Sequence, residues 1–445
     1  MAYHFIGIKG TGMAALACIL HDEKKEVAGS DIEKYIFTED GLRSRGIPIY
    51  PFDPANIHDH DTVIIGLSFD RSNPEVAAAM DNPTVKTYYY NEYLGILLKR
   101  YNSICVAGTH GKSTTTGILG QVLSHFGKTG FLIGDGHGYM PKNADNFVLE
   151  SCEFQRHFLA YSPDYAIITN IELDHVDYYK DMDDYLAAFQ SFIHQIKKKA
   201  VIFGDDPYLK DLDYKVPCVT YGLNEGNDYR AINVEMGSYG MHFDCVYDND
   251  KSIHVELPEV GIPFLQDALG CFALCHEIGM EASDIVEGLK EYQGIARRFV
   301  VEEVKDSVCI DDYAHHPTAI RYMIDAARKK YPGKKVVALY KPDRYSRLQY
   351  FLDEFAESLN TADQVCLCDF PKNAKREDDT ITVTIQDLLD RCPNSILLDI
   401  DQKSAEALKE MAPAVYVFMS SKDIYLLKDM LKRFYKGIFI STLFV

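Results

Sequence analysis

Short apolar and β-branched runs alternate with helical stretches along almost the whole chain. This alternation is typical of α/β proteins whose sheets are mainly parallel. The pattern therefore predicts an α/β fold. The expected strands cover residues 3–8, 26–30, 62–66, 104–108, 147–149, 165–169, 199–203, 307–311, 335–340, 364–368, 396–399 and 414–419.

One region departs from this alternation. Within residues 225–260, apolar and polar residues alternate one by one, which is the pattern of antiparallel strands. A length of 445 residues also exceeds one ordinary core. We therefore predict three domains, which are a Rossmann-like domain at 1–98, a central P-loop ATPase-like domain with a mixed sheet at 99–297, and a Rossmann-like α/β domain at 298–445.

Composition and charge narrow the range of partners. Acidic residues outnumber basic ones by 66 to 46, and the net charge of −20 argues against DNA or RNA as a partner. No apolar run reaches the ~20 residues of a spanning helix, so membrane insertion is not expected. The N-terminal residues lead straight into a predicted strand, with no basic segment or cleavage site, so a signal peptide is not expected either. The cysteines are scattered as reduced core residues. A cytoplasmic protein, monomeric or homodimeric, is the expectation.

A glycine-rich turn follows the first predicted strand. Gly7, Gly10, Thr11 and Gly12 lie where the turn opens a helix, and Asp31 follows the next strand. Glycines let a backbone approach a phosphate, and a helix N-terminus supplies N–H donors. The acid lies about where a dinucleotide fold binds ribose, but the glycine spacing differs from the NAD fingerprint. A nucleotide diphosphate is the favoured ligand, with NAD and a ligand-free turn as alternatives.

A second glycine-rich loop joins a predicted buried strand to a helix. It is shorter than the usual phosphate loop, but its Gly-Lys-Ser sequence is typical of one. Lys112 is expected to neutralise the β- and γ-phosphates of a nucleoside triphosphate, and Ser113 to reach Mg²⁺. The residues expected to contact the nucleotide are Gly108, Thr109, His110, Gly111, Lys112, Ser113 and Thr114.

Acidic residues and a histidine follow two other predicted strands. Glu150 ends one strand, and Asp174 and His175 follow another. In a parallel sheet both positions fall at the carboxyl edge, beside the phosphate loop. A carboxylate, an imidazole and a hydroxyl can hold Mg²⁺ when phosphate and water supply the other ligands. Ser113, Glu150 and His175 are therefore the predicted metal ligands, although a lone histidine there is more often a capping or core residue.

Arginines and histidines gather in three segments of the last third of the chain. These are Arg297-Arg-Phe299, Asp311-Asp-Tyr-Ala-His-His-Pro317 and Lys341-Pro-Asp-Arg-Tyr-Ser-Arg347. Paired arginines suit an anionic ligand such as an amino-acid carboxylate, which they can hold with two hydrogen bonds. A solvated loop with ion pairs is the alternative.

Together these segments resemble the Mur ligase family, in the same order over nearly the whole chain. The resemblance implies UDP-sugar binding for 1–98, ATP binding for 99–297 and amino-acid binding for 298–445. The UDP-sugar residues it implies are Gly7, Gly10, Thr11, Gly12 and Asp31. The catalytic residues it implies are Lys112, Glu150, His175, Arg298 and Asp312, the last two also contacting ATP. The amino-acid pocket it implies consists of Tyr313, His315, Arg344 and Arg347.

The activity that the resemblance implies is amide synthesis for peptidoglycan precursors. L-alanine, or another amino acid, would be joined to the carboxylate of UDP-N-acetylmuramate at the expense of ATP, with Mg²⁺ as cofactor. The carboxylate would first become an acyl phosphate, from which the amino group displaces phosphate. The alternative is a regulatory paralogue that binds the UDP-sugar or nucleotide with little ligase turnover. An NAD-linked oxidoreductase is a third candidate.

Several positions depart from the family pattern. Phe264 and Asp267 replace asparagines that help to hold adenine, and Cys152 replaces an aspartate. Ser420-Ser-Lys422 replaces a glycine-rich turn, and Asp343 replaces a histidine beside the amino-acid pocket. An aspartate near adenine changes the hydrogen-bond pattern there. A carboxylate at position 343 would discourage a purely apolar amino-acid side chain.

Overall fold

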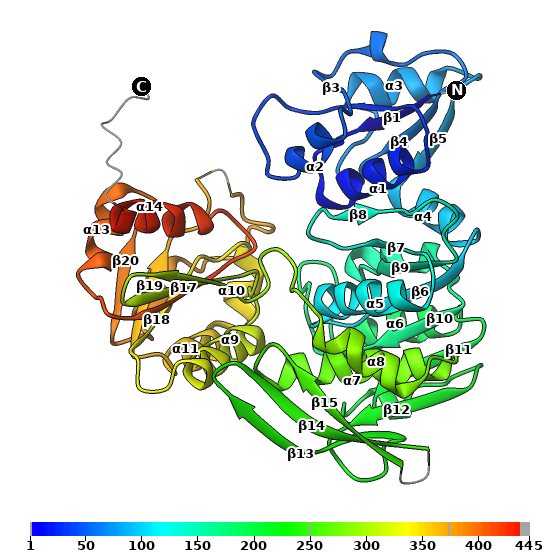
Figure 1. Cartoon of the computed structure of the whole chain (residues 1–445). Coiled ribbons are helices and arrows are strands. Elements are labelled where there is room, and N and C mark those ends of the chain that lie inside the picture. Colours follow the sequence, from blue (N-terminus) through cyan, green and yellow to red (C-terminus); the bar gives the residue numbers. More distant parts are fainter. Residues whose placement is uncertain (1, 249–250, 373, 437–445) are drawn as a thin grey trace.

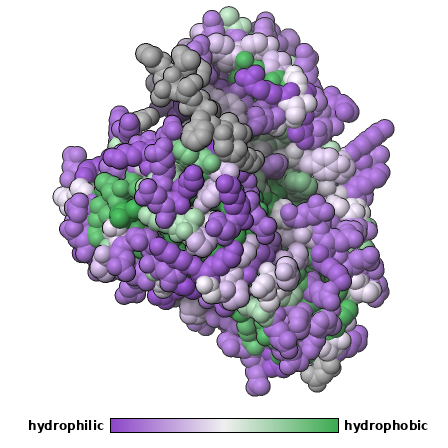
Figure 2. All heavy atoms as spheres, turned by 60° about the vertical axis from the view of Figure 1, so that its left-hand side comes forward, coloured by the Kyte–Doolittle hydropathy of each residue, from purple (hydrophilic) through white to green (hydrophobic). Residues whose placement is uncertain are grey.

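The computed structural model describes residues 2–248, 251–372 and 374–436, and this part of the chain contains three sheets flanked by helices (Figure 1). The predicted α/β fold is confirmed. Met1, which begins the predicted first domain, and residues 437–445, which end the predicted third domain, lie outside the described residues. Among the helices described, none has the length and apolar character needed to cross a membrane. The face shown in Figure 2 is mostly hydrophilic, in keeping with the net charge of −20.

The first sheet is parallel throughout, in the order β3-β2-β1-β4-β5. Its first strand ends at Ile6, before the expected residue 8, because Gly7 turns the chain with a φ of 82° that glycine adopts without strain. The strands are β1 (Tyr3–Ile6), β2 (Val27–Ser30), β3 (Ile49–Tyr50), β4 (Thr62–Ile65) and β5 (Lys86–Tyr89). The helices are α1 (Thr11–Asp22), α2 (Glu39–Ser44), α3 (Pro74–Asp81) and α4 (Tyr90–Leu98), with a 3-10 turn η1 (Pro54–Asn56).

The second sheet is mixed, as predicted, with parallel strands around β6 and antiparallel strands β13, β14 and β15 at one edge. Its order is β15-β14-β13-β12-β11-β10-β6-β9-β7-β8. The strands are β6 (Asn102–Ala107), β7 (Thr129–Leu132), β8 (Gly138–Tyr139), β9 (Asn146–Glu150), β10 (Tyr165–Ile168), β11 (Lys199–Phe203), β12 (Cys218–Gly222), β13 (Tyr229–Gly237), β14 (Gly240–Tyr247) and β15 (Lys251–Leu257). The helices are α5 (Lys112–Phe126), α6 (Met182–Ile193), α7 (Ile262–Glu277) and α8 (Ala282–Lys290), with η2 (Phe154–Ala160) and η3 (Leu209–Asp211).

The third sheet is parallel except for β16, which pairs antiparallel with β17. Its order is β16-β17-β21-β18-β19-β20. The strands are β16 (Val300–Val304), β17 (Ser307–Asp312), β18 (Val336–Tyr340), β19 (Gln364–Cys368), β20 (Ser395–Leu398) and β21 (Val415–Met419). The helices are α9 (Pro317–Lys330), α10 (Tyr345–Tyr350), α11 (Leu352–Leu359), α12 (Ile385–Leu389), α13 (Gln402–Lys409) and α14 (Tyr425–Lys436).

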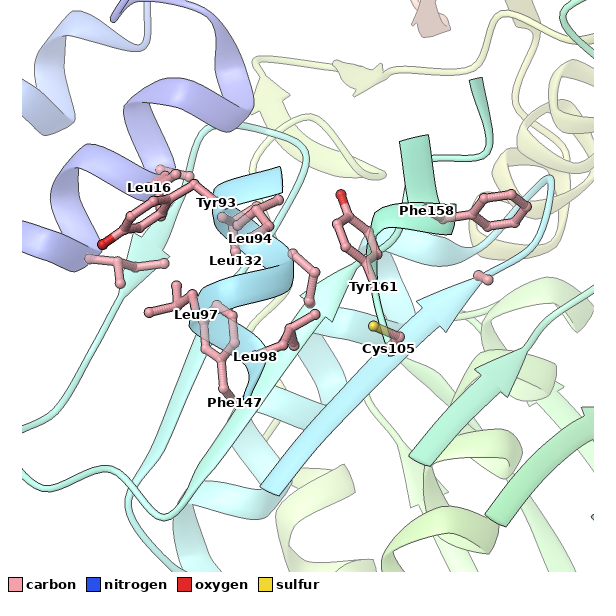
Figure 3. Packing of buried hydrophobic residues seen from close by; sticks show 14 of the residues in the cluster. Leu16, Tyr93, Leu94, Leu97, Leu98, Cys105, Leu132, Phe147, Phe158 and Tyr161 are labelled. Atoms are coloured by element: carbon pink, nitrogen blue, oxygen red, sulfur yellow. The ribbon is translucent and has the colours of Figure 1, made fainter. Parts of the chain in front are cut away.

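One apolar cluster joins the first two sheets. Leu16 of α1, Leu97 of α4 and Phe147 of β9 belong to the same set of buried residues (Figure 3). Gly138 of β8 lies so close to α1 that a Cβ there would come within 2.1 Å of the Ala15 carbonyl oxygen. Because interiors are close-packed, this shared core fixes the glycine-rich turn relative to the second sheet.

Candidate active site

The phosphate loop leaves β6 at the carboxyl edge of the second sheet and enters α5. Gly108 and Gly111 have φ angles of 138° and 81°, which glycine tolerates and other residues rarely adopt. A Cβ on Gly108 would lie 2.1 Å from Thr169 Oγ1, and one on Gly111 would lie 2.2 Å from Asp267 Oδ1. The loop therefore requires glycine at both positions, and it leads into a helix N-terminus that favours anions.

Lys112 is held inside this loop. Its ammonium donates hydrogen bonds to the carbonyls of Gly108 (2.6 Å) and Thr109 (3.0 Å), and it pairs with Glu153 at 2.9 Å. Burial alone would lower the pKa of Lys112, but the Glu153 carboxylate outweighs this and raises the pKa. The ammonium is therefore charged. Sequence analysis missed Glu153, although it lies only three residues beyond Glu150, the last residue of β9.

Ser113, Glu150 and Arg298 meet at the start of α5. The Ser113 hydroxyl donates to Glu150 Oε1 at 3.0 Å and accepts from Arg298 Nη2 at 3.0 Å. The backbone N–H of Gly134 orients the other Glu150 oxygen at 2.6 Å. A hydroxyl and a carboxylate are the hard oxygen donors that Mg²⁺ prefers, so these residues fit the ion. The three predicted residues thus come together from segments far apart in the sequence.

His175 lies beside Glu153, its Nε2 3.5 Å from Glu153 Oε1. The residue has a φ of 52°, and its Nδ1 has no hydrogen-bond partner in the part of the chain that the structure describes. Backbone strain of this kind in a non-glycine residue is often found at functional sites. His175 therefore approaches the loop from the Lys112 and Glu153 side.

Asp312 ends β17, and Tyr313 and His315 follow it, where the third sheet faces the phosphate loop. The Asp312 carboxylate accepts from the backbone N–H groups of Phe299 (2.8 Å) and Ala314 (2.7 Å). The Arg298 guanidinium lies 5.2 Å from the Tyr313 ring centre, within the range of a cation–π contact. Burial lowers the pKa of His315 to about 4, so this side chain is neutral near pH 7.

Both arginines of the predicted amino-acid pocket are paired with acids. Arg347 is buried, and it bonds Asp174 at 2.8 Å and both Asp343 oxygens at 2.7 and 2.9 Å. Arg344 forms an ion pair with Asp177. Asp343 also accepts from Ser421 at 2.9 Å. The charge of Asp343 is therefore balanced within the chain. Asp343 does not present the free carboxylate that was expected, from the sequence, to discourage a purely apolar amino-acid side chain.

The glycine-rich turn after β1 is held by Asp31. The carboxylate accepts from the backbone N–H groups of Lys9 (2.7 Å) and Ile32 (2.8 Å). The Lys9 ammonium forms a buried ion pair with Glu39 at 2.6 Å. A Cβ on Gly12 would lie 2.3 Å from the Tyr90 hydroxyl. Asp31 therefore shapes the turn as well as being a candidate ligand residue.

A cavity of about 370 Å³ opens beside the phosphate loop, within the size range of nucleotide and cofactor sites. His110 and Gly111 line it on one side, and Pro263, Gln266 and Asp267 of α7 line it on another. Burial raises the pKa of the Asp267 carboxyl well above its usual value. The Phe264 ring instead packs against Tyr292, 5.5 Å between ring centres.

Three family models match consecutive parts of the chain. Their descriptions are "Mur ligase family, catalytic domain" for residues 2–102, "Mur ligase middle domain" for 106–275 and "Mur ligase, glutamate ligase domain" for 297–427. The chain belongs to the Mur ligase family. The matched segments contain the glycine-rich turn, the phosphate loop and the arginine pair respectively. The resemblance predicted from the sequence is thereby confirmed.

Solved structures of other Mur ligases agree with this assignment. UDP-N-acetylmuramate-alanine ligase MurC of Thermotoga maritima is 26% identical, with a TM-score of 0.80 over 98% of this chain and 100% of that chain. A murein peptide ligase of Psychrobacter arcticus is 24% identical, and its TM-score of 0.72 over 99% of this chain and 100% of that chain shows the shared fold. A ligase from Neisseria meningitides, described as UDP-N-acetylmuramate:L-alanyl-gamma-D-glutamyl-meso-diaminopimelate ligase, is 26% identical, with a TM-score of 0.58 over 66% of this chain and 99% of that chain.

Proposed function

We propose that this Mur ligase joins an amino acid, L-alanine in the first instance, to the carboxylate of UDP-N-acetylmuramate with consumption of ATP. The observation that carries the proposal is the meeting of Ser113, Glu150 and Arg298 at the start of α5. A hydroxyl and a carboxylate, both of the kind that Mg²⁺ prefers, and a guanidinium thus meet at one phosphate loop, which supports the proposal. The MurC of Thermotoga maritima, similar over almost the full length of both chains, is named for ligation to alanine.

The cavity beside the loop would hold the adenosine of ATP, and the loop itself would hold the phosphates. Lys112 would leave Glu153 for the phosphate oxygens, and Arg298 would donate to the transferring phosphoryl group. Mg²⁺ bound by Ser113, Glu150 and His175 would supply further positive charge. The glycine-rich turn after β1 would hold the UDP diphosphate at the N-terminus of α1.

The reaction then needs no side-chain nucleophile. A carboxylate oxygen of the UDP-sugar would attack the γ-phosphorus, and ADP would leave. The amino nitrogen would next attack the acyl carbon, releasing phosphate and losing a proton as the amide forms. Tyr313, His315 and Arg344, at the third sheet, are the proposed contacts for the amino acid. Apposition of the second and third sheets would keep water from the acyl phosphate.

A phosphate-release assay tests this proposal. We expect release only when UDP-N-acetylmuramate, Mg-ATP and an amino acid are all present, with L-alanine the best of a panel of the common amino acids. Omission of any one component should abolish release, because each is required for amide formation. Tight binding of the UDP-sugar without turnover on any amino acid would overturn the ligase proposal and favour the regulatory alternative.

Asp267 provides a second prediction, on the pH dependence of ATP use. Asp267 replaces an asparagine that helps to hold adenine in the family pattern. A neutral carboxyl can donate one hydrogen bond to adenine and accept another, as an asparagine does, whereas the ionised form only accepts. Because burial raises the pKa of Asp267, the KM for ATP should increase as pH rises through that pKa. Asp267→Asn should remove this rise. At the highest pH tested, its KM for ATP should be about tenfold below that of the native chain, since the free energy of about one hydrogen bond corresponds to this factor.

Asp379→Asn is the matched control for this variant, because it makes the same change at an exposed aspartate. It should keep the pH profile of the native chain. A native KM for ATP that is flat with pH, or a rise that persists in Asp267→Asn, would contradict the role given to Asp267.

A further inference from the structure

Two histidines and a glutamate converge between the second and third sheets. They are His110 of the phosphate loop, Glu172 after β10, and His316, which precedes α9. One nitrogen or oxygen of each lies within 4.8 Å of those of the other two. Glu172 Oε2 lies 2.7 Å from His110 Nε2 and 3.8 Å from His316 Nδ1. This cluster is separate from the oxygen pair formed by Ser113 and Glu150.

The side chain of His316 is buried and makes no hydrogen bond to the described residues. It is 2% exposed, and neither of its ring nitrogens has a hydrogen-bond partner in the described part of the chain. The ring packs between His110 and Phe351, with ring centres 4.9 and 4.8 Å away. An unpaired buried polar atom is costly. A cation bound to Nδ1 would satisfy the nitrogen that faces Glu172.

The surrounding residues orient the cluster as the outer shell of a metal site does. Thr318 donates from its hydroxyl to Glu172 Oε1 at 2.6 Å, which leaves Oε2 directed to the two imidazoles. The backbone N–H of His110 donates to Asn170 Oδ1 at 2.9 Å. His110, Glu172 and Thr318 also line the cavity of about 370 Å³, which gives an ion a route in and room for a fourth ligand.

We propose that His110, Glu172 and His316 form a binding site for a borderline divalent cation, Zn²⁺ in particular, with its fourth position open to the cavity. Two imidazoles and one carboxylate suit Zn²⁺, whereas Mg²⁺ selects oxygen ligands. The ion takes the place of the proton in the His110–Glu172 hydrogen bond, and that proton passes to the solvent. Bound zinc joins the phosphate loop of the second sheet to the residue that precedes α9 in the third.

Zinc binding to the full-length protein, without nucleotide and in excess Mg²⁺, tests the site. We expect one Zn²⁺ per chain by equilibrium dialysis, a zinc-dependent rise in melting temperature, and the visible absorption of four-coordinate Co²⁺ when cobalt is used. His316→Gln should weaken zinc binding more than about 100-fold, because it removes a ligand, whereas loss of a residue that only orients a ligand weakens binding about 10- to 100-fold. Thr318→Ala keeps all three ligands and should weaken binding about 10- to 100-fold.

Two other variants locate the ion. His254→Gln removes an exposed imidazole that also bonds a carboxylate, Asp244, at 2.9 Å, and it should leave zinc affinity unchanged. His175→Gln should also leave it unchanged. The proposal is overturned if either of these variants loses the zinc, if folded His316→Gln binds as tightly as the native chain, or if Co²⁺ shows only six-coordinate absorption.

Discussion

Replacing Lys112 by methionine is expected to lower kcat for phosphate release roughly 10³-fold, the range for losing a group that stabilises a transferring phosphoryl group. Methionine keeps most of the apolar length of lysine but removes the charge. The ammonium lies inside the loop, 2.6 Å from the Gly108 carbonyl oxygen, and the uncharged methionine side chain cannot donate the hydrogen bonds that it makes. Steady-state kinetics at saturating substrates measure this effect, and KM for the UDP-sugar should change little because the site proposed for that ligand is at α1.

Lys128→Met is the matched control, since Lys128 is exposed just beyond the C-terminal end of α5. It should retain native kcat. Loss of Lys112 also leaves the buried Glu153 without its ion pair at 2.9 Å, so melting temperature must be measured beside kcat. A folded Lys112→Met chain with kcat within tenfold of native would contradict the role of Lys112 in phosphoryl transfer.

The fold was predictable because its strands are short and apolar and its antiparallel edge alternates. β6 and β18 are buried almost throughout, and a buried parallel strand is apolar along its whole length. The phosphate loop was predictable for a related reason, since Gly108 and Gly111 adopt φ angles that restrict the residue type. Local sequence determines both features.

Contacts between distant segments were less accessible to sequence analysis. The pairing of Lys112 with Glu153, and of Arg347 with Asp174, depends on how loops after different strands meet. The sequence indicated that Arg347 could bind an external carboxylate, but it could not show that carboxylates of the chain already surround it. His316 was part of a recognised motif, yet its approach to Glu172 follows from the docking of α9 on the second sheet.

Arg347→Met is expected to destabilise the protein by about 3–5 kcal/mol, the cost of leaving a buried ion pair without one partner. Arg347 is 3% exposed and is the shared partner of Asp174, from the second sheet region, and Asp343, from the third. Its loss leaves two largely buried carboxylates without the guanidinium that they share. Urea unfolding of the full chain measures the effect. Arg391→Met is the control, because Arg391 has a 2.7 Å ion pair with Asp353 but is well exposed, and it should cost less than about 1 kcal/mol.

The pH dependence separates this electrostatic loss from a simple packing defect. Burial would raise the pKa of Asp174 and Asp343, but the Arg347 guanidinium outweighs it and holds both below their usual range. The pKa of an aspartate in the unfolded chain is about 4. In the native chain the ion pairs of Arg347 with Asp174 and Asp343 therefore stabilise the fold above this pH, and their contribution is lost as pH falls further.

Without the guanidinium, burial raises the pKa of these two carboxyls, so the variant gains relative stability as they become protonated. The stability gap between Arg347→Met and the native chain should then narrow as pH is lowered from 7 toward 4. Adding Asp343→Asn to Arg347→Met should recover part of the loss at pH 7, because one buried charge is removed. A gap that is constant with pH and unaffected by Asp343→Asn would show that Arg347 acts through packing alone.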